Sequence, residues 1–445
     1  MKKYIFTIIV LLSTAVTRGQ TLNEFLEKAK KNYPLLVAKQ HEISARQEQL
    51  SYIRSTALPS MDMLYQVNYA TYNNITGLAV STFVPISGPP VPVNVFPGVF
   101  GSAGSIMLNW EPFTFGQRKA AVHTAESYLH FQEADADQEI FQHQLKVISK
   151  YLDVVFSAEL IKVFSKNLER AEENTRIVKS LAGSGLRPGV DTAMFQAESV
   201  RARIELLNYD NQFRTFRTEL SEFIGGEPVN DVTDSIYFES LPTIRVDSAT
   251  GLHPLIRIFS ERVNINLRER IALQRTLFPR LSFWGTAYGR GSGIAIDGTA
   301  NPEEGLTLSH YNYGGGLILS IPILRFANLR HLVSTRNSLI HAEEERLNLV
   351  RLQLEKQKQV AEASLDNAFK IASESPVFYQ SAELAYRALL SRYNSGLVNS
   401  ADLILAQYTL IKAESDMKKS YIDVWKALLN LAAVEGDLGV FMDQL

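Results

Sequence analysis

The sequence contains no cysteine among its 445 residues. This absence excludes disulfides, thiolate metal sites, a cysteine nucleophile and a lipid anchor on an N-terminal Cys. An excess of positive charge is also missing, because 45 Lys and Arg against 47 Asp and Glu give a formal net charge of −2. Nucleic-acid-binding domains usually carry a basic surface, so the composition predicts no nucleic-acid partner.

Long apolar runs are missing as well, since no stretch approaches the ~20 apolar residues of a transmembrane helix. At the N-terminus, Lys2 and Lys3 precede a short apolar run, Tyr4–Val16, and the segment Thr17–Gln20. A basic start, a short apolar core and small residues after it are typical of a signal peptide. We therefore expect residues 1–20 to be a signal peptide on an exported chain, and any membrane crossing to use strands.

Proline and glycine are rare over two long stretches. Between Pro112 and Gly183 the sequence has only Gly116, and Phe326–Ser395 contains only Pro376. Both stretches are rich in good helix formers, and ~65 helical residues at 1.5 Å each span about 100 Å. Helices of this length must pack side by side, and we expect a kink or break at Pro376. Shorter helical patterns cover residues 22–56, 190–224, 254–276 and 400–435.

Apolar and polar residues alternate with period two in two further regions. We expect one β-hairpin over about residues 60–112 and another over about residues 280–322, each with segments of ~10 residues, enough for a tilted strand to cross a bilayer. Amphipathic hairpins on a soluble protein are the alternative, but aromatics near the segment ends favour a membrane interface. These aromatics include Tyr65, Tyr69, Trp110, Phe283, Trp284, Tyr311 and Tyr313. The long hairpin loops, 83–98 and 289–310, are expected to face outside the cell.

The chain also repeats itself. Two prolines recur 220 residues later, Pro34 as Pro254 and Pro59 as Pro279. Ser184-Gly185-Leu186, Asp191 and Gln196 recur 211 residues later as Ser395-Gly396-Leu397, Asp402 and Gln407. We therefore expect a first repeat over residues 21–230, an equatorial connector over 225–250 and a second repeat over 251–445.

Four strands per chain are too few for a membrane barrel, which needs about eight. An open sheet edge in lipid leaves backbone groups unpaired at several kcal/mol each, so we expect the barrel to be shared between chains. Two chains supply eight strands and three supply twelve, and only the larger barrel leaves room for a channel.

No enzyme signature is present. The eight histidines form no metal-ligand pair such as HExxH, and no Gly-x-Ser-x-Gly elbow occurs. Glu126 and His130 lie four residues apart on a predicted helix, where a solvated face explains them. We expect no catalytic residue, no cofactor and no metal site.

Several motifs resemble those of the TolC-like outer-membrane efflux protein family. They occur in the family's order, are duplicated, and extend the resemblance over essentially the whole mature chain. These are Thr21-Leu22-Asn23-Glu24-Phe25 with Asn32-Tyr33-Pro34, the strand entries Leu58-Pro59 and Phe278-Pro279, and the strand exits 111–116 and 321–326. The resemblance implies a mixed fold, in which an all-α tunnel of long antiparallel helices continues a twelve-stranded transmembrane β-barrel completed by a trimer.

The resemblance also implies a function. The chain is expected to be the outer-membrane duct of a tripartite efflux or type I secretion system, with its helical tunnel in the periplasm. Its partners are then outer-membrane lipid, a periplasmic adaptor (membrane fusion) protein and an inner-membrane pump or ABC exporter. A periplasmic coiled-coil scaffold without transport activity is the alternative, although a scaffold needs no bilayer-length strands.

The family's functional tips are the two periplasmic helix–helix turns. The resemblance assigns adaptor docking to Gly185, Leu186, Gly396 and Leu397, and a tunnel gate to Asp191, Asp402 and Tyr393. Arg187, four residues before Asp191, is the nearest candidate counter-charge of this gate in the sequence, and pointing at the adaptor is its alternative role. Val398 and Leu405 stand where some members carry a gate arginine and a second aspartate, which indicates a simpler charge network. Helix capping explains Asp191 and Asp402 equally well, because Asp is favoured near a helix N-terminus.

Overall fold

The computed structural model describes residues 21–71, 94, 96–229, 234–243, 251–295 and 299–445. The expected signal peptide, most of the first hairpin loop and parts of the connector lie outside these residues. The chain divides into two compact units. The helical unit comprises Met1–Ile43, Phe131–Glu261 and Glu344–Leu445, and the strand unit comprises Ser44–His130 and Arg262–Glu343.

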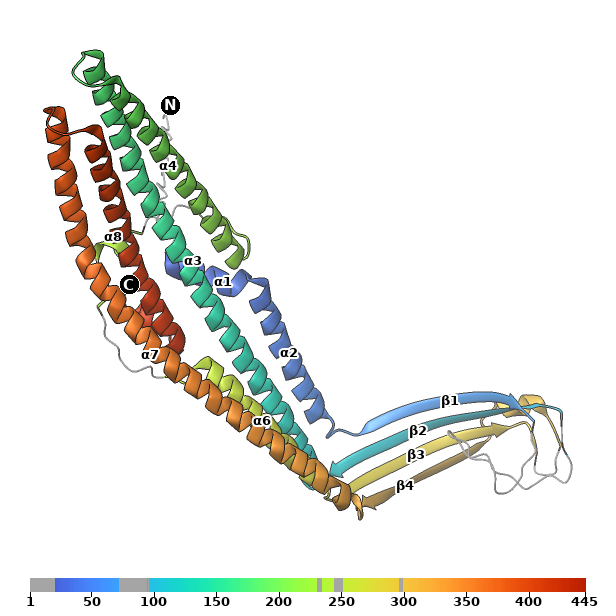
Figure 1. Cartoon of the computed structure of the whole chain (residues 1–445). Helices are drawn as coiled ribbons and strands as arrows, with labels where there is room; N and C mark the ends of the chain where they lie inside the picture. The colour runs from blue at the N-terminus through green and yellow to red at the C-terminus, as the bar shows by residue number, and fades with distance from the viewer. Residues whose placement is uncertain (1–20, 72–93, 95, 230–233, 244–250, 296–298) are drawn as a thin grey trace, which may run out of the picture. The chain divides into compact units, whose positions relative to one another are not determined.

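The structure is mostly helical, as expected from the long stretches without proline and glycine (Figure 1). The described helices are α1 (Leu22–Asn32), α2 (Pro34–Ser55), α3 (Gln117–Gly183), α4 (Gly189–Phe223), α5 (Ile236–Glu239), α6 (Pro254–Arg275), α7 (Arg325–Asn394), α8 (Ser400–Glu435) and α9 (Gly439–Met442). The predicted limits of the long helices agree with α3 and α7 to within a few residues at their C-terminal ends. Within the described chain, none of these helices combines the length and apolarity that a membrane crossing needs.

The first predicted helix, over residues 22–56, is two helices. Tyr33 adopts an extended conformation (φ −71°, ψ 120°) between α1 and α2. The physical reason is Pro34, whose ring disfavours the helical conformation of the preceding residue.

Of the kink or break expected at Pro376, the break is excluded, because α7 continues through this proline. Proline supplies no N–H to the carbonyl four residues earlier, which belongs to Ala372. The Ser375 hydroxyl donates to that carbonyl at 3.1 Å and lies 2.7 Å from the Ser420 hydroxyl of α8. A local side-chain hydrogen bond therefore replaces the missing backbone bond within a partly buried contact between α7 and α8.

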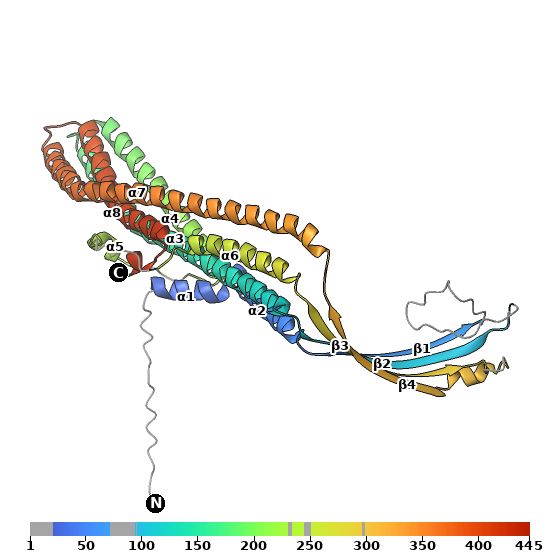
Figure 2. The same cartoon turned by 90° about the horizontal axis from the view of Figure 1, so that it is seen from below.

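The two predicted hairpins form one antiparallel four-stranded sheet in the order β1-β2-β3-β4. The strands are β1 (Ser60–Ala70), β2 (Val99–Phe113), β3 (Arg280–Ser292) and β4 (His310–Ser320). β2 and β3 join the hairpins with the register Gly104↔Gly289 and Asn109↔Trp284, followed by a bulge between Trp110 and Phe113. Figures 1 and 2 show the four strands side by side in two orthogonal views. A 3₁₀ helix, Pro302–Leu306, follows β3.

Trp425 of α8 lies at the centre of the largest apolar core, which belongs to the helical unit. Its ring is 1% exposed and makes edge contacts with Tyr237 of α5 and Phe441 of α9 at centroid distances of 5.1 and 5.7 Å. Tyr151 of α3 continues the cluster, and its hydroxyl donates to Asp234 at 2.9 Å. The short helices of the chain therefore pack around the long ones at this level.

Two histidines of the helical unit, His253 and His143, are buried. His253 precedes α6; its Nδ1 accepts the Leu255 N–H at 3.0 Å and its Nε2 lies 3.2 Å from the Ala433 carbonyl of α8. Burial lowers the pKa of His253, and the hydrogen bond to Ala433 only partly opposes this effect. The ring of His143 in α3 stacks on the Tyr33 ring, with the ring centroids 3.9 Å apart. Burial lowers the pKa of His143 too. Protonation of the His253 Nδ1 places a proton against the Leu255 N–H. The hydrogen bond by which His253 caps α6 is then lost.

We expect acid to destabilise the helical unit through these histidines. Because their pKa values in the folded state lie below the ordinary 6.5, their contribution to stability is complete above pH ~6.5 and decreases as the pH falls below it. The midpoint of urea unfolding, measured between pH ~7.5 and ~5.5, should therefore decrease on the acid side. His253→Asn keeps a cap acceptor without titrating, so its acid-side slope should be shallower. An equal slope in wild type and variant would contradict this assignment.

Candidate tunnel tip

The predicted site residues lie in and beside two helix–helix turns of the helical unit. Residues 184–188 join α3 to α4, and residues 395–399 join α7 to α8. In the first turn, the Leu186 N–H donates to the Leu181 carbonyl and the Gly185 N–H donates to the Ala182 carbonyl, both at 3.0 Å. In the second turn, Leu397 and Gly396 make the same two bonds, to Arg392 and Tyr393, at 2.9 Å each. These bonds define a Schellman motif at both tips.

Gly185 and Gly396 end the two incoming helices in the left-handed region, with φ of +71° and +81°. A Cβ added at either glycine would meet no atom within 4 Å. The glycines are therefore required by the backbone conformation and not by a close neighbour. This geometry holds the next residue of each turn away from the helices.

Leu186 and Leu397 follow these glycines and are 70% and 68% exposed. Both side chains occupy the same place in the two Schellman motifs, so the repeat presents the same apolar residue twice.

Asp191 of α4, in contrast, is only 6% exposed and is held within the chain. Its Oδ2 accepts a hydrogen bond from the Tyr393 hydroxyl of α7, and its Oδ1 accepts one from the Ser400 hydroxyl of α8, both at 3.0 Å. Burial, followed by the bond to Asp191, raises the pKa of Tyr393 to about 12, so this hydroxyl remains a donor at neutral pH. The carboxylate thereby joins the first-repeat tip to the second-repeat tip.

Arg187 reinforces the same contact between the tips. Its guanidinium donates to the backbone carbonyls of Tyr393 and Val398. The guanidinium carbon also lies 4.1 Å from the centre of the Tyr393 ring, within the range of a cation–π interaction. Arg187 thus clamps the end of α7, in addition to its position in the exposed turn.

Asp402, the counterpart of Asp191 in the second repeat, is exposed. Its backbone N–H donates to the Asn399 side chain at 2.8 Å, so Asn399 caps α8. Neither aspartate is the N-cap residue, because α4 follows Pro188 without a side-chain cap and Asn399 caps α8, but both lie in the first turn of their helix, where Asp is favoured. The two aspartates differ in their surroundings because the repeats differ in sequence. The second-repeat counterpart of Arg187 is Val398, and the first-repeat counterpart of Tyr393 is Ala182.

Ser400 and a buried amide network were not predicted. Asn174 donates to the side chains of Gln407 and Tyr386, at 2.9 and 3.1 Å, and Gln407 donates to Asn167 at 3.2 Å. These residues join α3, α7 and α8 behind the tips. The repetition of Gln196 as Gln407 was the available signal, but periodicity does not reveal which of the two is buried.

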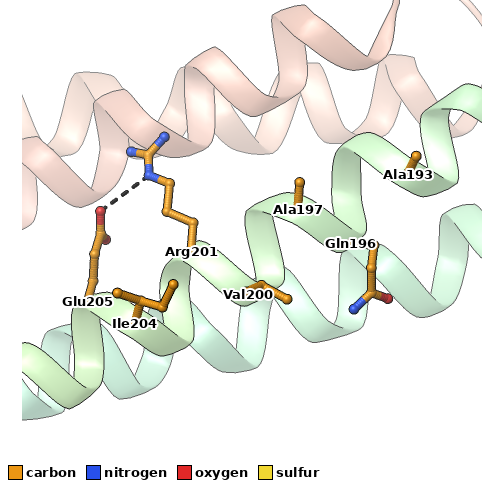
Figure 3. Close-up of a pocket in the computed structure, with 7 residues that line it drawn as sticks. All are labelled: Ala193, Gln196, Ala197, Val200, Arg201, Ile204 and Glu205. Atoms are coloured by element: carbon orange, nitrogen blue, oxygen red, sulfur yellow. Dashed lines mark hydrogen bonds and ion pairs between the residues drawn. The ribbon is translucent and has the colours of Figure 1, made fainter.

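An apolar groove lies on an exposed face of α4 (Figure 3). It has a volume of about 730 Å³ and is lined by Ala193, Gln196, Ala197, Val200, Arg201, Ile204 and Glu205. Ala193, Ala197, Val200 and Ile204 follow the 4,3,4 spacing of a coiled-coil seam and are exposed. Arg201 and Glu205 form an ion pair at 3.3 Å beside the seam. Across the described residues, no group of three or more His, Asp or Glu side chains is placed to hold a metal ion.

Comparison with known proteins extends these observations. Residues 25–226 match the family model "Outer membrane efflux protein", whereas no curated protein matches the chain by sequence. Among solved structures, the chain is similar to the outer membrane protein VceC of Vibrio cholerae, with 14% identity, a TM-score of 0.71, and 94% of this chain and 96% of that chain covered. The chain is also similar to the CmeC outer membrane channel of Campylobacter jejuni, with 16% identity, a TM-score of 0.71, and 93% of this chain and 85% of that chain covered.

The MtrE outer membrane channel of Neisseria gonorrhoeae, in its open state, gives 14% identity, a TM-score of 0.70 and coverage of 94% and 89%. At these identities the similarity establishes the fold. Residues 25–226 therefore match the outer membrane efflux protein family, and the chain as a whole shares the fold of the outer-membrane channels named above.

Proposed function

We propose that three copies of this chain together form one outer-membrane channel. The channel exports substrates by way of a periplasmic adaptor and an inner-membrane pump or ABC exporter. The observation that carries the proposal is the four-stranded sheet, whose strands of 11–15 residues are long enough to cross a bilayer. The function is a conduit and not a catalyst.

The sheet edges support sharing of the barrel between chains. Among the described strands, β1 pairs only with β2 and β4 pairs only with β3. In lipid, each unpaired backbone group at such an edge costs several kcal/mol. Pairing β4 of one copy with β1 of the next closes three sheets into twelve strands, wide enough for a lumen.

The natural absence of cysteine allows a direct test of this pairing. We expect Leu64→Cys on β1, combined in turn with single cysteines along β4 between Tyr311 and Leu319, to give disulfide-linked species at one or two matching registers. The linked ladder on denaturing gels should stop at three chains, because the third link closes the ring. A stable folded monomer in mild detergent, or a ladder that extends beyond three chains, would contradict the trimer.

The tips supply the second half of the proposal. Gly185-Leu186 and Gly396-Leu397 present two similar apolar turns per chain, and a trimer presents six of them to an adaptor. Asp191, Tyr393 and Arg187 hold the two tips of each chain together, and we propose that they set the resting diameter of the tunnel mouth. Asp402 is exposed and is the candidate for a ring of carboxylates that favours cations.

A further inference from the structure

The four junctions between strands and helices lie at one end of the sheet. Ser60 at the start of β1 pairs with Asn109 near the end of β2, and Arg280 at the start of β3 pairs with Ser320 at the end of β4. Phe113 of β2 pairs with Leu281 of β3. Residues 54–59, 111–119, 275–280 and 320–330 are therefore neighbours around this end of the strand unit, and we call them the collar.

The collar has a charge unlike that of the rest of the chain. It contains seven basic residues and a single acidic one, Glu111, whereas the whole chain has a net charge of −2. The basic residues are Arg54, Arg118, Lys119, Arg275, Arg280, Arg325 and Arg330. Each of the four junctions contributes at least one of them. This concentration of positive charge was not apparent from the overall composition.

Several of these charges are available to a partner. Lys119, Arg275, Arg325 and Arg330 are exposed. In the part of the chain that the structure describes, none of the four forms an ion pair. Arg54 pairs with Glu126, and Arg280 lies 3.9 Å from Glu111, so these two are partly neutralised. The free positive charge is therefore concentrated at the starts of α3 and α7 and at the end of α6.

Exposed apolar side chains alternate with these bases. Phe113 is 62% exposed, Leu324 78% and Phe326 61%. Phe115 is 51% exposed although its φ of +45° lies in the left-handed region, where a phenylalanine is strained. The backbone thus holds this ring at the surface at a conformational cost. Large apolar groups beside basic groups fit the boundary between acyl chains and headgroups, where the rings contact lipid and the cations contact phosphate.

We propose that the collar binds the phosphates of anionic phospholipids in the membrane leaflet nearest the helices. The proposal rests on the proposed channel, whose sheet places the collar at the membrane surface on the helical side. Electrostatic attraction accounts for the basic residues, and insertion at the headgroup level accounts for the exposed rings. An acidic protein bound at the same place would need the charges but would give the exposed phenylalanines no apolar phase.

The test uses the tryptophans that the sheet places near the collar. Trp110 lies one residue from the collar on β2, and Trp284 pairs with its neighbour Asn109, whereas Trp425 is buried in the helical unit. The full chain is reconstituted in vesicles containing brominated phosphatidylglycerol or brominated phosphatidylcholine. Quenching of tryptophan fluorescence then gives the binding constant of each lipid relative to its unbrominated form, in low salt and in high salt.

We expect wild type to prefer phosphatidylglycerol, and the preference to shrink in high salt because the charges are screened. A base near an anionic surface contributes roughly fivefold in binding. Replacing Lys119, Arg275, Arg325 and Arg330 with Gln should therefore lower the preference at least about fivefold. The matched control replaces four exposed bases of the helical unit with Gln: Lys166, Lys179, Arg351 and Lys412. The control should retain the wild-type preference.

Equal quenching by the two lipids in wild type, or an unchanged preference in the collar variant, would overturn the proposal. An equal loss of the lipid preference in the control variant would also overturn it. So would displacement of the bound lipid by an acidic protein but not by added phosphatidylglycerol. Trimers of the collar variant are counted separately by their heat-modifiable migration. If wild type itself forms no trimers, the proposed channel is wrong, whatever lipid the collar prefers.

Discussion

Replacing Leu186 and Leu397 with Asp is expected to abolish export while leaving the trimer in the membrane. Both side chains are about 70% exposed, so their removal costs the fold at most ~0.5 kcal/mol, as for most surface substitutions. An adaptor that covers them loses its central apolar contacts and must bury a charge instead, which commonly costs more than 2 kcal/mol per anchor. Accumulation of a fluorescent efflux substrate in cells measures the loss.

The control places the same charge in the same turns without removing the leucines. Ser184→Asp and Ser395→Asp lie two residues before Leu186 and Leu397, and both serines are exposed. Export should persist in this variant, and trimer yield should be equal in all three proteins. Gly185→Asn and Gly396→Asn should also be tolerated, because Asn accepts the left-handed conformation better than other residues. Normal export by the leucine variant would show that docking lies elsewhere.

Asp191→Ala and Asp402→Ala are expected to give opposite results, although the two aspartates are counterparts in the repeat. Removal of the Asp191 carboxylate leaves the buried hydroxyls of Tyr393 and Ser400 without their acceptor, at a cost of ~1–3 kcal/mol. The two tips of each chain then separate more easily, and single-channel conductance in planar bilayers should rise. Asp402 is exposed and holds no other residue, so its removal should weaken cation preference with little change in conductance.

Two further variants distinguish the hydrogen bonds that hold the tips together from the charge of the Asp191 carboxylate. Tyr393→Phe and Ser400→Ala each remove one hydrogen bond and keep the carboxylate, so conductance should rise while cation preference stays. Arg187→Gln removes the clamp on the Tyr393 and Val398 carbonyls and should act in the same direction. Identical conductance in wild type and Asp191→Ala would mean that this contact does not set the tunnel mouth.

The element pattern and the repeat were predictable because their causes are local. Helix formers without proline or glycine give α3 and α7, and period-two alternation gives the strands. Gly-Leu after a long helix predicts the ends of α3 and α7, since glycine in the left-handed region is determined by the residue itself. The same local reasoning left a kink or a break open at Pro376. The helix continues there, Ser375 replaces the lost hydrogen bond, and the contact with Ser420 of α8 lies outside any sequence window.

The site was predicted as a set of residues but not as an arrangement. The sequence treats Asp191 and Asp402 as equivalents, because the repeat offset and the neighbouring Gly-Leu motifs are the same for both. The structure distinguishes them, since Tyr393 and Ser400 reach Asp191 from 202 and 209 residues away along the chain. Likewise, the collar charges belong to four separate segments that only strand pairing brings together.

The sequence by itself therefore determined the helices, the strands, the duplication and the turn residues, because helix propensity, side-chain alternation and glycine conformation act over a few residues. Tertiary structure alone decided that β2 pairs with β3, that one aspartate is buried and its counterpart exposed, and that the bases converge at one end of the sheet. Those outcomes depend on contacts between residues up to hundreds of positions apart, and no local preference of the chain encodes them.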